Sequence, residues 1–261
     1  MQTFKLILEY DGTDFAGWQS QAAGRRTVQG VLEAAIARVC GARRIRLVGA
    51  GRTDAGVHAE GQVASVSLAT RLLPEELARA LNAVLPDDLA VVGLMAMPGA
   101  FHARRDAVSK LYRYRIWNGA RRSALRARTA YAVPVPLDVA AMREAARALE
   151  GTHDFAGFQS TGSSATTTVR TLLRLDVCGA PGDEIAIEVE GTGFLRHMVR
   201  ALVGTLLEVG SGKRPAESMS VLLAARDRGQ AGPTAPARGL TLVRVDYGNP
   251  RDPDRLAVPP A

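Results

Sequence analysis

Residues 49–59 read Gly-Ala-Gly-Arg-Thr-Asp-Ala-Gly-Val-His-Ala, with an arginine, a threonine and an aspartate between glycines. Strand-like segments flank this stretch at 45–48 and 62–68, which predicts a glycine-rich loop between two strands. Glycine adopts backbone conformations that other residues cannot, and it lets a ligand approach the chain closely. The carboxylate of Asp54, presented on such a loop beside Arg52, is therefore a candidate catalytic group. The alternative is an ordinary turn or helix-cap aspartate.

The segments around this loop carry alternating strand and helix patterns. Phe4 to Tyr10 has apolar residues at every second position, whereas 27–39 has them at helical spacing. Pro74, followed by two glutamates, is typical of a helix start, because proline fits the first turn and acids favour its positive end. The predicted order of the first half is strand, helix, strand, strand, helix, strand, over about 4–10, 27–39, 45–48, 62–68, 74–84 and 89–97.

The second half repeats this order. Its predicted elements are a strand over 109–117, a helix over 137–149, strands over 171–178 and 184–190, a helix from near Phe194, a shorter helix over 216–225 and a strand over 240–246. Two βαββαβ halves predict an α+β fold with mainly antiparallel sheets. We predict that residues 1–103 form the half with the glycine-rich loop, that 104–248 form the other half, and that the proline-containing segment 249–261 is a tail.

Composition and length indicate a globular protein. The chain has 261 residues, of which 47% are hydrophobic and 23% charged. No apolar run approaches the roughly 20 residues of a membrane span, and a strand that starts at Phe4 leaves no room for a signal peptide. Cys40 and Cys178 form no CxxC pair, so we expect a reducing compartment, with the cytoplasm as the default and a Cys40–Cys178 disulfide as the alternative.

The basic charge is concentrated in one stretch. The whole chain has 33 Lys and Arg against 26 Asp and Glu, but residues 104–128 hold nine basic residues and the single acid Asp106. Arginine suits phosphate, because its guanidinium fork pairs bidentately with phosphate oxygens. The stretch predicts contact with nucleic acid, and a solvated basic face is the alternative. The candidate residues for contact with a nucleic-acid backbone, which the resemblance described below makes an RNA backbone, are Arg104, Arg105, Arg113, Arg115, Arg121 and Arg122.

Several separate motifs resemble one family. Residues 51–59 are similar to the signature loop of the tRNA pseudouridine synthase A family. The other matching motifs, in the family's order, are Tyr10-Asp-Gly-Thr-Asp-Phe-Ala-Gly-Trp-Gln19, Thr27-Val-Gln-Gly-Val-Leu-Glu33, Phe101-His-Ala-Arg104, Lys110-Leu-Tyr-Arg-Tyr114, Gly193-Phe-Leu-Arg-His-Met-Val-Arg200 and Ala237-Arg-Gly-Leu240. The likeness runs from about residue 4 to 247, and a set of motifs in order is far more specific than any one of them.

The resemblance implies the pseudouridine synthase fold, with the two sheets joined around a central cleft, and it implies a reaction. That reaction converts uridine to pseudouridine in the anticodon stem-loop of tRNA, around positions 38–40: uracil leaves C1′ of the ribose and reattaches through C5. Since atoms are only rearranged, the resemblance implies no cofactor and no metal. The sequence agrees, because it has no P-loop, no dinucleotide fingerprint and no Cys/His ligand cluster. A homodimer, with one tRNA contacting both subunits, is also implied.

The resemblance assigns roles to two residues, Asp54 and Tyr112. Asp54 corresponds to the family's catalytic aspartate; it could attack C1′, attack the base or remove a ribose proton, and the sequence does not choose among these. Tyr112 corresponds to the active-site tyrosine, which could stack on uracil and take the C5 proton, although a core tyrosine is the alternative. Separately from the resemblance, we predict Arg52 and Arg200 near Asp54, because a cation beside a carboxylate holds it ionised. For Arg200 the alternative is a surface arginine that extends into solvent, and Arg52 could also fill the space left by a flipped base.

Two other classes of protein remain as hypotheses beside the synthase. A non-catalytic RNA-binding protein would keep the basic stretch, but it has no need for Arg-Thr-Asp on a glycine-rich loop, and the repeated aromatic motif of sheet-type RNA binders is absent. A glycoside or nucleoside hydrolase would use Asp54 as nucleophile, but it normally needs a second carboxylate as acid or a metal. Release of tritium from C5-labelled uridine in tRNA separates the synthase from both.

Overall fold

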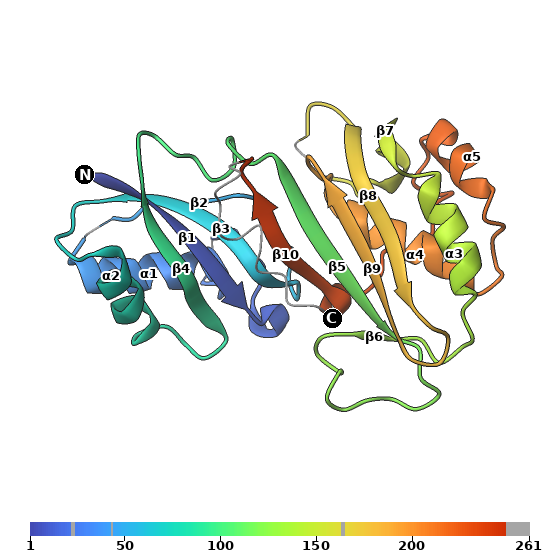
Figure 1. Cartoon of the computed structure of the whole chain (residues 1–261), viewed down its shortest axis with the longest axis horizontal. Helices are drawn as coiled ribbons and strands as arrows, with labels where there is room; N and C mark the ends of the chain where they lie inside the picture. Colours follow the sequence, from blue (N-terminus) through green and yellow to red (C-terminus); the bar gives the residue numbers. More distant parts are fainter. Residues whose placement is uncertain (22–23, 43, 163–164, 249–261) are drawn as a thin grey trace. The chain divides into compact units, whose positions relative to one another are not determined.

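A computed structural model describes residues 1–21, 24–42, 44–162 and 165–248, and these form two compact units (Figure 1). Among the described residues, unit 1 contains Met1–Val108 together with 242–248, and unit 2 contains Ser109–Thr241. The units therefore divide the chain five residues later than the boundary that we predict after residue 103. They also return the end of the described chain to the first unit. The predicted tail, 249–261, lies outside the described residues.

Unit 1 is an antiparallel sheet with two helices on one side (Figure 1). Its strands lie in the order β4-β1-β3-β10, and the short β2 pairs with β3. The bounds are β1 Gln2–Tyr10, β2 Val48–Gly49, β3 His58–Leu68, β4 Leu89–Met97 and, from Leu242 on, β10 Leu240–Asp246; the helices are α1 Val28–Cys40 and α2 Pro74–Asn82, and a single 3₁₀ turn, η1, covers Gly12–Asp14.

Local sequence signals set the helix ends of unit 1. The Thr27 hydroxyl accepts the Gly30 N–H and caps α1, and Gly41 ends this helix in the left-handed conformation (φ 62°). The predicted start of α2 at Pro74 is confirmed, and Glu76 accepts the Leu73 N–H at its N-terminus. Leucines from both helices are buried in the core, and each buried leucine side chain stabilises the fold by about 1.5–3 kcal/mol.

Unit 2 is a second antiparallel sheet with strand order β5-β9-β8-β7. A two-residue strand, β6, pairs with β5 in parallel. The bounds are β5 Ser109–Trp117, β6 Tyr131–Ala132, β7 Gly151–Asp154, β8 Val169–Gly179 and β9 Glu184–Gly191; the helices are α3 Val139–Arg147, α4 Met198–Gly210 and α5 Ser218–Ala225, with 3₁₀ turns η2 at Ala156–Phe158 and η3 at Ala237–Gly239. The predicted α+β class with mainly antiparallel sheets is confirmed.

Four details differ from the prediction. The predicted strand over 45–48 is instead the two-residue β2 at Val48–Gly49, and β3 begins at His58 rather than at residue 62. The strands β6 and β7 were not predicted, because two to four residues are too short for a periodic signal. Helix α4 begins at Met198 rather than near Phe194, since His197 adopts a left-handed conformation (φ 60°) that interrupts the helix. Finally, β10, which we predict to close the second half, lies beside β3 in unit 1 from Leu242 on. Its side chains alternate little in exposure, as in a strand that is covered on both faces.

None of the helices among the described residues is both long and apolar enough to cross a membrane. The same residues contain no group of three or more His, Cys, Asp and Glu side chains that could hold a metal ion. Cys40, which is half-buried, and Cys178, which is exposed, are both free thiols, so the alternative of a disulfide between them is wrong.

Candidate active site

The glycine-rich loop of unit 1 is fixed at its centre by Thr53. The hydroxyl of this buried residue lies 2.8 Å from the hydroxyl of Tyr10, and its carbonyl accepts the Trp18 N–H at 3.0 Å. Burial raises the pKa of Tyr10 to about 12, so the phenol stays protonated as a hydrogen-bonding group at neutral pH. Arg52, which is exposed, and Asp54, which is half-buried, flank this fixed point. The two candidate side chains are therefore carried on either side of a buried anchor.

The far side of the loop is a turn held by the chain between β1 and α1. The Val57 N–H donates to the Asp54 carbonyl at 3.2 Å, and the Gly56 N–H donates to the Phe15 carbonyl at 3.4 Å. Gly17 approaches the loop so closely that an added Cβ would lie 2.9 Å from the Thr53 carbonyl oxygen, and its φ of 99° is one that L side chains rarely adopt. The Tyr10–Gln19 motif is thus the clamp of the Asp54 loop.

Gln62 and His58, both on β3, complete this clamp. The Gln62 side chain is fully buried and donates to the Gly51 carbonyl at 3.1 Å. Nδ1 of the buried His58 accepts the Gly12 N–H at 3.1 Å, which fits a loop-holding role for this histidine. Asp11 lies at 3.1 Å from the same nitrogen, and a protonated Nδ1 would pair with it and lose the Gly12 bond, so the two contacts are alternatives.

Unit 2 carries Tyr112 and Tyr114 on one face of β5. Tyr112 lies opposite Val189 of β9 and is 8% exposed, and its ring packs edge-on against Phe194 with centroids 5.2 Å apart. Tyr114 is fully buried and donates from its hydroxyl to the Pro236 carbonyl at 2.8 Å. Burial raises the pKa of Tyr114 far above its usual value. Tyr114 is thus a core residue.

Arg200 lies on α4 in unit 2 and is half-buried. Its Nε donates to the carbonyl of Ala235 at 2.7 Å, and its own carbonyl accepts the Ala235 N–H at 3.0 Å. The guanidinium also lowers the pKa of Tyr114 against the larger effect of burial. These contacts hold the side chain against the protein, in contrast to a surface arginine that extends into solvent.

Comparison with known proteins identifies the family. The family model for tRNA pseudouridine synthase matches residues 6–104 and 145–248. The chain belongs to this family. It is 47% identical to the tRNA pseudouridine synthase A of Syntrophotalea carbinolica over 97% of this chain and 98% of that one. The enzymes of the same name from Myxococcus xanthus (48%, covering 95% of this chain and 92% of that one) and Geobacillus kaustophilus (47%, covering 94% and 95%) are similar to it as well.

Membership of the tRNA pseudouridine synthase family decides among the three hypotheses from the sequence. It favours the synthase over the non-catalytic RNA-binding protein and over the hydrolase. Arg52, Asp54 and Arg200 lie inside the ranges that the family model matches. Tyr112 lies in the interval 105–144, between those ranges.

The candidate RNA-binding arginines fall into two groups. Arg104, Arg105, Arg121 and Arg122 are exposed, and of these Arg105 pairs with its neighbour Asp106 at 3.2 Å. Arg113 and Arg115 instead lie on the face of β5 opposite the tyrosines and pair with acids of β9. Arg113 lies 2.8 Å from Glu188, which stands opposite it in the register, and Arg115 lies 3.8 Å from Glu184. Counting charges along residues 104–128 does not reveal that Arg113 and Arg115 are paired, because the acids that pair with them belong to another strand.

The structure thus assembles the candidate residues within each unit and adds others that the sequence did not single out as site residues. In unit 1, Arg52 and Asp54 flank Thr53, which forms a polar cluster with Tyr10 and Gln62. The only signal for Gln62 in the sequence was a glutamine at the start of the predicted strand 62–68, and its full burial is visible only in the structure. Unit 2 joins Tyr112 to Phe194 and ties Arg200 to Ala235. For Ala235 no signal existed, because only its backbone takes part.

Proposed function

We propose that this chain isomerises uridine to pseudouridine in the anticodon stem-loop of tRNA, around positions 38–40, with Asp54 as nucleophile and without a cofactor. The observation that carries the proposal is the Asp54 loop. A half-buried carboxylate follows a threonine whose hydroxyl and carbonyl are both fixed, within the range that the family model matches. A carboxylate that must meet a reacting carbon benefits from this kind of support, since a displacement of about 1 Å lowers a rate by about 100-fold.

The chemistry needs one well-placed carboxylate. Cleavage of the bond between C1′ and the base develops positive charge on the ribose, which the Asp54 carboxylate stabilises or captures covalently. Uracil then turns and bonds through C5, and the C5 proton leaves to a base. Three roles of Asp54 are consistent with this exchange of bonds: attack on C1′, attack on the base and removal of a ribose proton. In each of them Asp54 acts before the new carbon–carbon bond forms.

The remaining candidates support this step. Tyr112, with its ring against Phe194, would stack on the displaced uracil and accept the C5 proton. Arg200 would hold the carboxylate of Asp54 ionised, and the exposed Arg52 would fill the space of the flipped base. Arg104, Arg105, Arg121 and Arg122 are exposed and suited to the phosphates of the anticodon arm. Arg113 and Arg115 are the less favoured members of that set, because acids of β9 already pair with them.

Release of tritium tests the proposal. We expect wild-type protein to release tritium from tRNA that carries C5-tritiated uridine, and Asp54→Ala and Asp54→Asn to release it at least about 1,000-fold more slowly. Asp87→Ala, which removes an exposed aspartate from the loop between α2 and β4, is the matched control and should keep the wild-type rate. No release by the wild type contradicts the synthase, and release by Asp54→Ala at the wild-type rate contradicts the role of Asp54.

The region of tRNA is tested separately. Transcripts of one tRNA that keep uridine at only position 38, 39 or 40 should each release tritium, whereas a transcript with uridine only outside the anticodon arm should release none. Release from the second kind of transcript alone would move the target out of the anticodon stem-loop while leaving the isomerase intact.

Assembly and location complete the proposal. We expect a homodimer in which one tRNA contacts both subunits, and sedimentation of the purified chain should give twice the mass of 27.7 kDa. A monomer at all concentrations used in the assay would contradict this. The cytoplasm is the compartment that fits a tRNA-modifying enzyme, and cell fractionation should recover the protein with the tRNA pool.

A further inference from the structure

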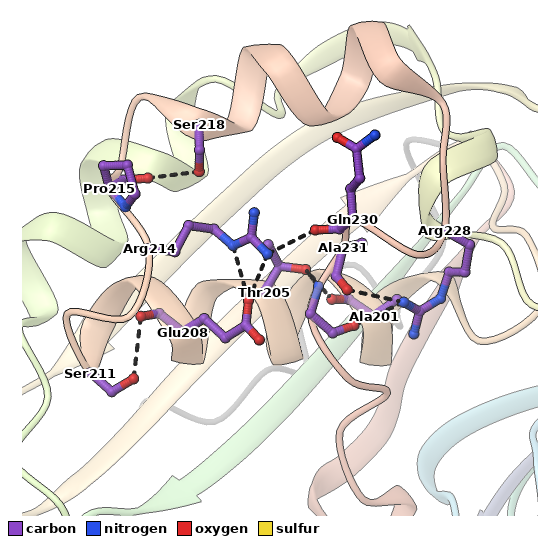
Figure 2. Close-up of polar contacts among 11 residues, drawn as sticks. Ala201, Thr205, Glu208, Ser211, Arg214, Pro215, Ser218, Arg228, Gln230 and Ala231 are labelled. Carbon is purple, nitrogen blue, oxygen red and sulfur yellow. Dashed lines mark hydrogen bonds and ion pairs between the residues drawn. The ribbon is translucent and has the colours of Figure 1, made fainter.

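The segment 227–236 of unit 2, here called the strap, runs along one side of helix α4 (Figure 2). As the strap proceeds from residue 230 to 235, its partners on α4 lie progressively closer to the N-terminus of the helix. The Gln230 carbonyl reaches Glu208 through Arg214, the Gly232 N–H reaches Thr205, and Ala235 reaches Arg200. Residues 200, 204–205 and 208 lie on one face of a helix because they are about one turn apart. The strap therefore ends at the arginine that we place in the active site.

The centre of the strap is held by Thr205, which is fully buried. Its hydroxyl donates to the Ala201 carbonyl at 2.8 Å and accepts the Gly232 N–H at 2.9 Å, so both of its hydrogen-bonding roles are used (Figure 2). Beside it, a Cβ on Gly204 would lie 1.7 Å from the Pro233 carbonyl oxygen. The strap can lie at this distance only because position 204 has no side chain.

Two arginines bind the strap: Arg214, which lies outside it, and Arg228, which belongs to it. Arg214 donates from Nε and a terminal nitrogen to one carboxylate oxygen of Glu208, at 2.9 and 2.8 Å, and also to the Gln230 carbonyl at 2.8 Å. Arg228 donates to the Gly232 carbonyl and to the Thr234 hydroxyl, both at 2.9 Å. The backbone of the strap is therefore fixed on both sides of Gly232 before the chain reaches Ala235.

Ala235 then holds Arg200 at two points, through Nε at 2.7 Å and through the backbone at 3.0 Å. The next residue, Pro236, accepts the Tyr114 hydroxyl at 2.8 Å, which anchors the end of the strap to β5. A guanidinium bonded through Nε keeps a fixed plane, and this geometry is compatible with bidentate binding of a carboxylate or phosphate by its terminal nitrogens.

We infer that the strap is the positioning element of Arg200, and that Thr205 and Arg228 are positioning residues for the isomerisation. Neither residue needs to touch tRNA. Thr205 holds the strap against α4 through the Gly232 N–H, and Arg228 fixes the backbone between Gly232 and Thr234. Together they place the carbonyl of Ala235, which binds the guanidinium of Arg200. The inference rests on the proposed function, in which Arg200 takes part in the isomerisation.

Thr205→Val tests the inference, because it keeps the volume of the side chain and removes the hydroxyl. At saturating tRNA we expect kcat for tritium release to fall about tenfold while KM changes by less than about twofold, since the arginines that contact phosphate are untouched. Thr205→Ser should restore kcat. The matched control is Ser218→Ala, which removes a hydroxyl bond of 2.7 Å to the Pro215 carbonyl at the start of α5 (Figure 2) and should keep the wild-type kcat.

A double-mutant cycle separates positioning from a general loss of structure. Thr205→Val should lower kcat no further when Arg200→Ala is already present, although it should still lower the melting temperature in that background. A wild-type kcat for Thr205→Val, a further loss in the Arg200→Ala background, or a wild-type kcat for Arg200→Ala itself overturns the inference. If Thr205→Val does not fold, Arg228→Lys replaces it, since lysine keeps the charge but cannot reach both Gly232 and Thr234.

These outcomes are distinct from a failure of the proposed function. Wild-type protein that releases no tritium, or an Asp54→Ala variant that keeps the full rate, overturns the proposed function and with it the role of the strap. A fully active wild type that needs Asp54 and Arg200 but tolerates Thr205→Val and Arg228→Lys overturns the strap alone.

Discussion

The Asp54 loop of unit 1 and the strap of unit 2 are both anchored by a threonine, but they differ in how far along the chain the functional residue lies from the segment that holds it. Each is anchored by a buried threonine hydroxyl, that of Thr53 on Tyr10 and that of Thr205 on the Gly232 N–H. In the loop the anchor is the direct neighbour of the functional residue. In unit 2, the residue of the strap that holds Arg200 is Ala235, which lies 35 residues further along the chain. A sequence motif therefore contains both the anchor and the functional residue of the Asp54 loop, whereas no single motif contains both Arg200 and Ala235.

The largest effect should come from breaking the anchor in the loop. Thr53→Val removes the hydroxyl beside Tyr10 and leaves the Asp54 side chain intact. We expect kcat for tritium release to fall about 100-fold, more than for Thr205→Val, because the nucleophile itself moves. Thr53→Ser should recover most of the rate. Equal losses at Thr53 and Thr205 would contradict the idea that a neighbouring anchor matters more than a distant one.

The second prediction concerns stability and the close approach of Gly17 to the Asp54 loop. Gly17→Ala places a Cβ 2.9 Å from the Thr53 carbonyl oxygen on a backbone with φ 99°. We expect a loss of about 1–3 kcal/mol in the free energy of unfolding, which lowers the melting temperature of a protein of this size by roughly 2–4 °C per kcal/mol. Gly24→Ala is the matched control, because that glycine also has a positive φ (68°) but nothing lies within 4 Å of the added Cβ. Equal losses for the two variants would show that the close contact contributes nothing.

The comparison also explains what the sequence could predict. The Asp54 loop, the order of the main elements and the two faces of β5 follow from local patterns, since periodicity and glycine placement act over a few residues. The location of β10 in unit 1, the pairing of Arg113 with Glu188 and the tie between Ala235 and Arg200 depend on residues far apart in the chain. No local pattern encodes such contacts, which arise only when the sheets and helices pack.

A third, smaller effect separates the exposed arginines from the paired ones. Arg121→Ala with Arg122→Ala should raise KM for tRNA several-fold and reduce the slope of log binding constant against log salt by about 2, because each lost phosphate contact removes about one released counterion. Arg113→Ala should leave the slope unchanged and lower the free energy of unfolding by about 1–3 kcal/mol, since its pair with Glu188 is largely buried. An unchanged salt slope in the double variant would exclude Arg121 and Arg122 from the tRNA interface.

The smallest effect at neutral pH should come from the ionisation of Tyr10, and it appears only in alkali. Burial raises the pKa of Tyr10 to about 12, whereas an unfolded tyrosine titrates near 10. The protonated phenol is thus the form that the fold favours, and its contribution is complete below pH 10. Between about pH 10 and 12 the unfolded chain loses this proton first, so stability falls as pH rises through the folded pKa.

Tyr10→Phe removes that titration together with the bond to Thr53. Denaturant unfolding at pH 8 to 12 should show that the difference in stability between wild type and Tyr10→Phe shrinks above pH 10. Thr53→Val keeps the tyrosine and loses only its partner, so its curve should keep the alkaline fall. Burial, and not the Thr53 bond, is the largest cause of the raised pKa, and the bond itself lowers it. A Thr53→Val curve that falls no more steeply between pH 10 and 12 than the Tyr10→Phe curve would show that the anchor, rather than the burial of Tyr10, controls its ionisation.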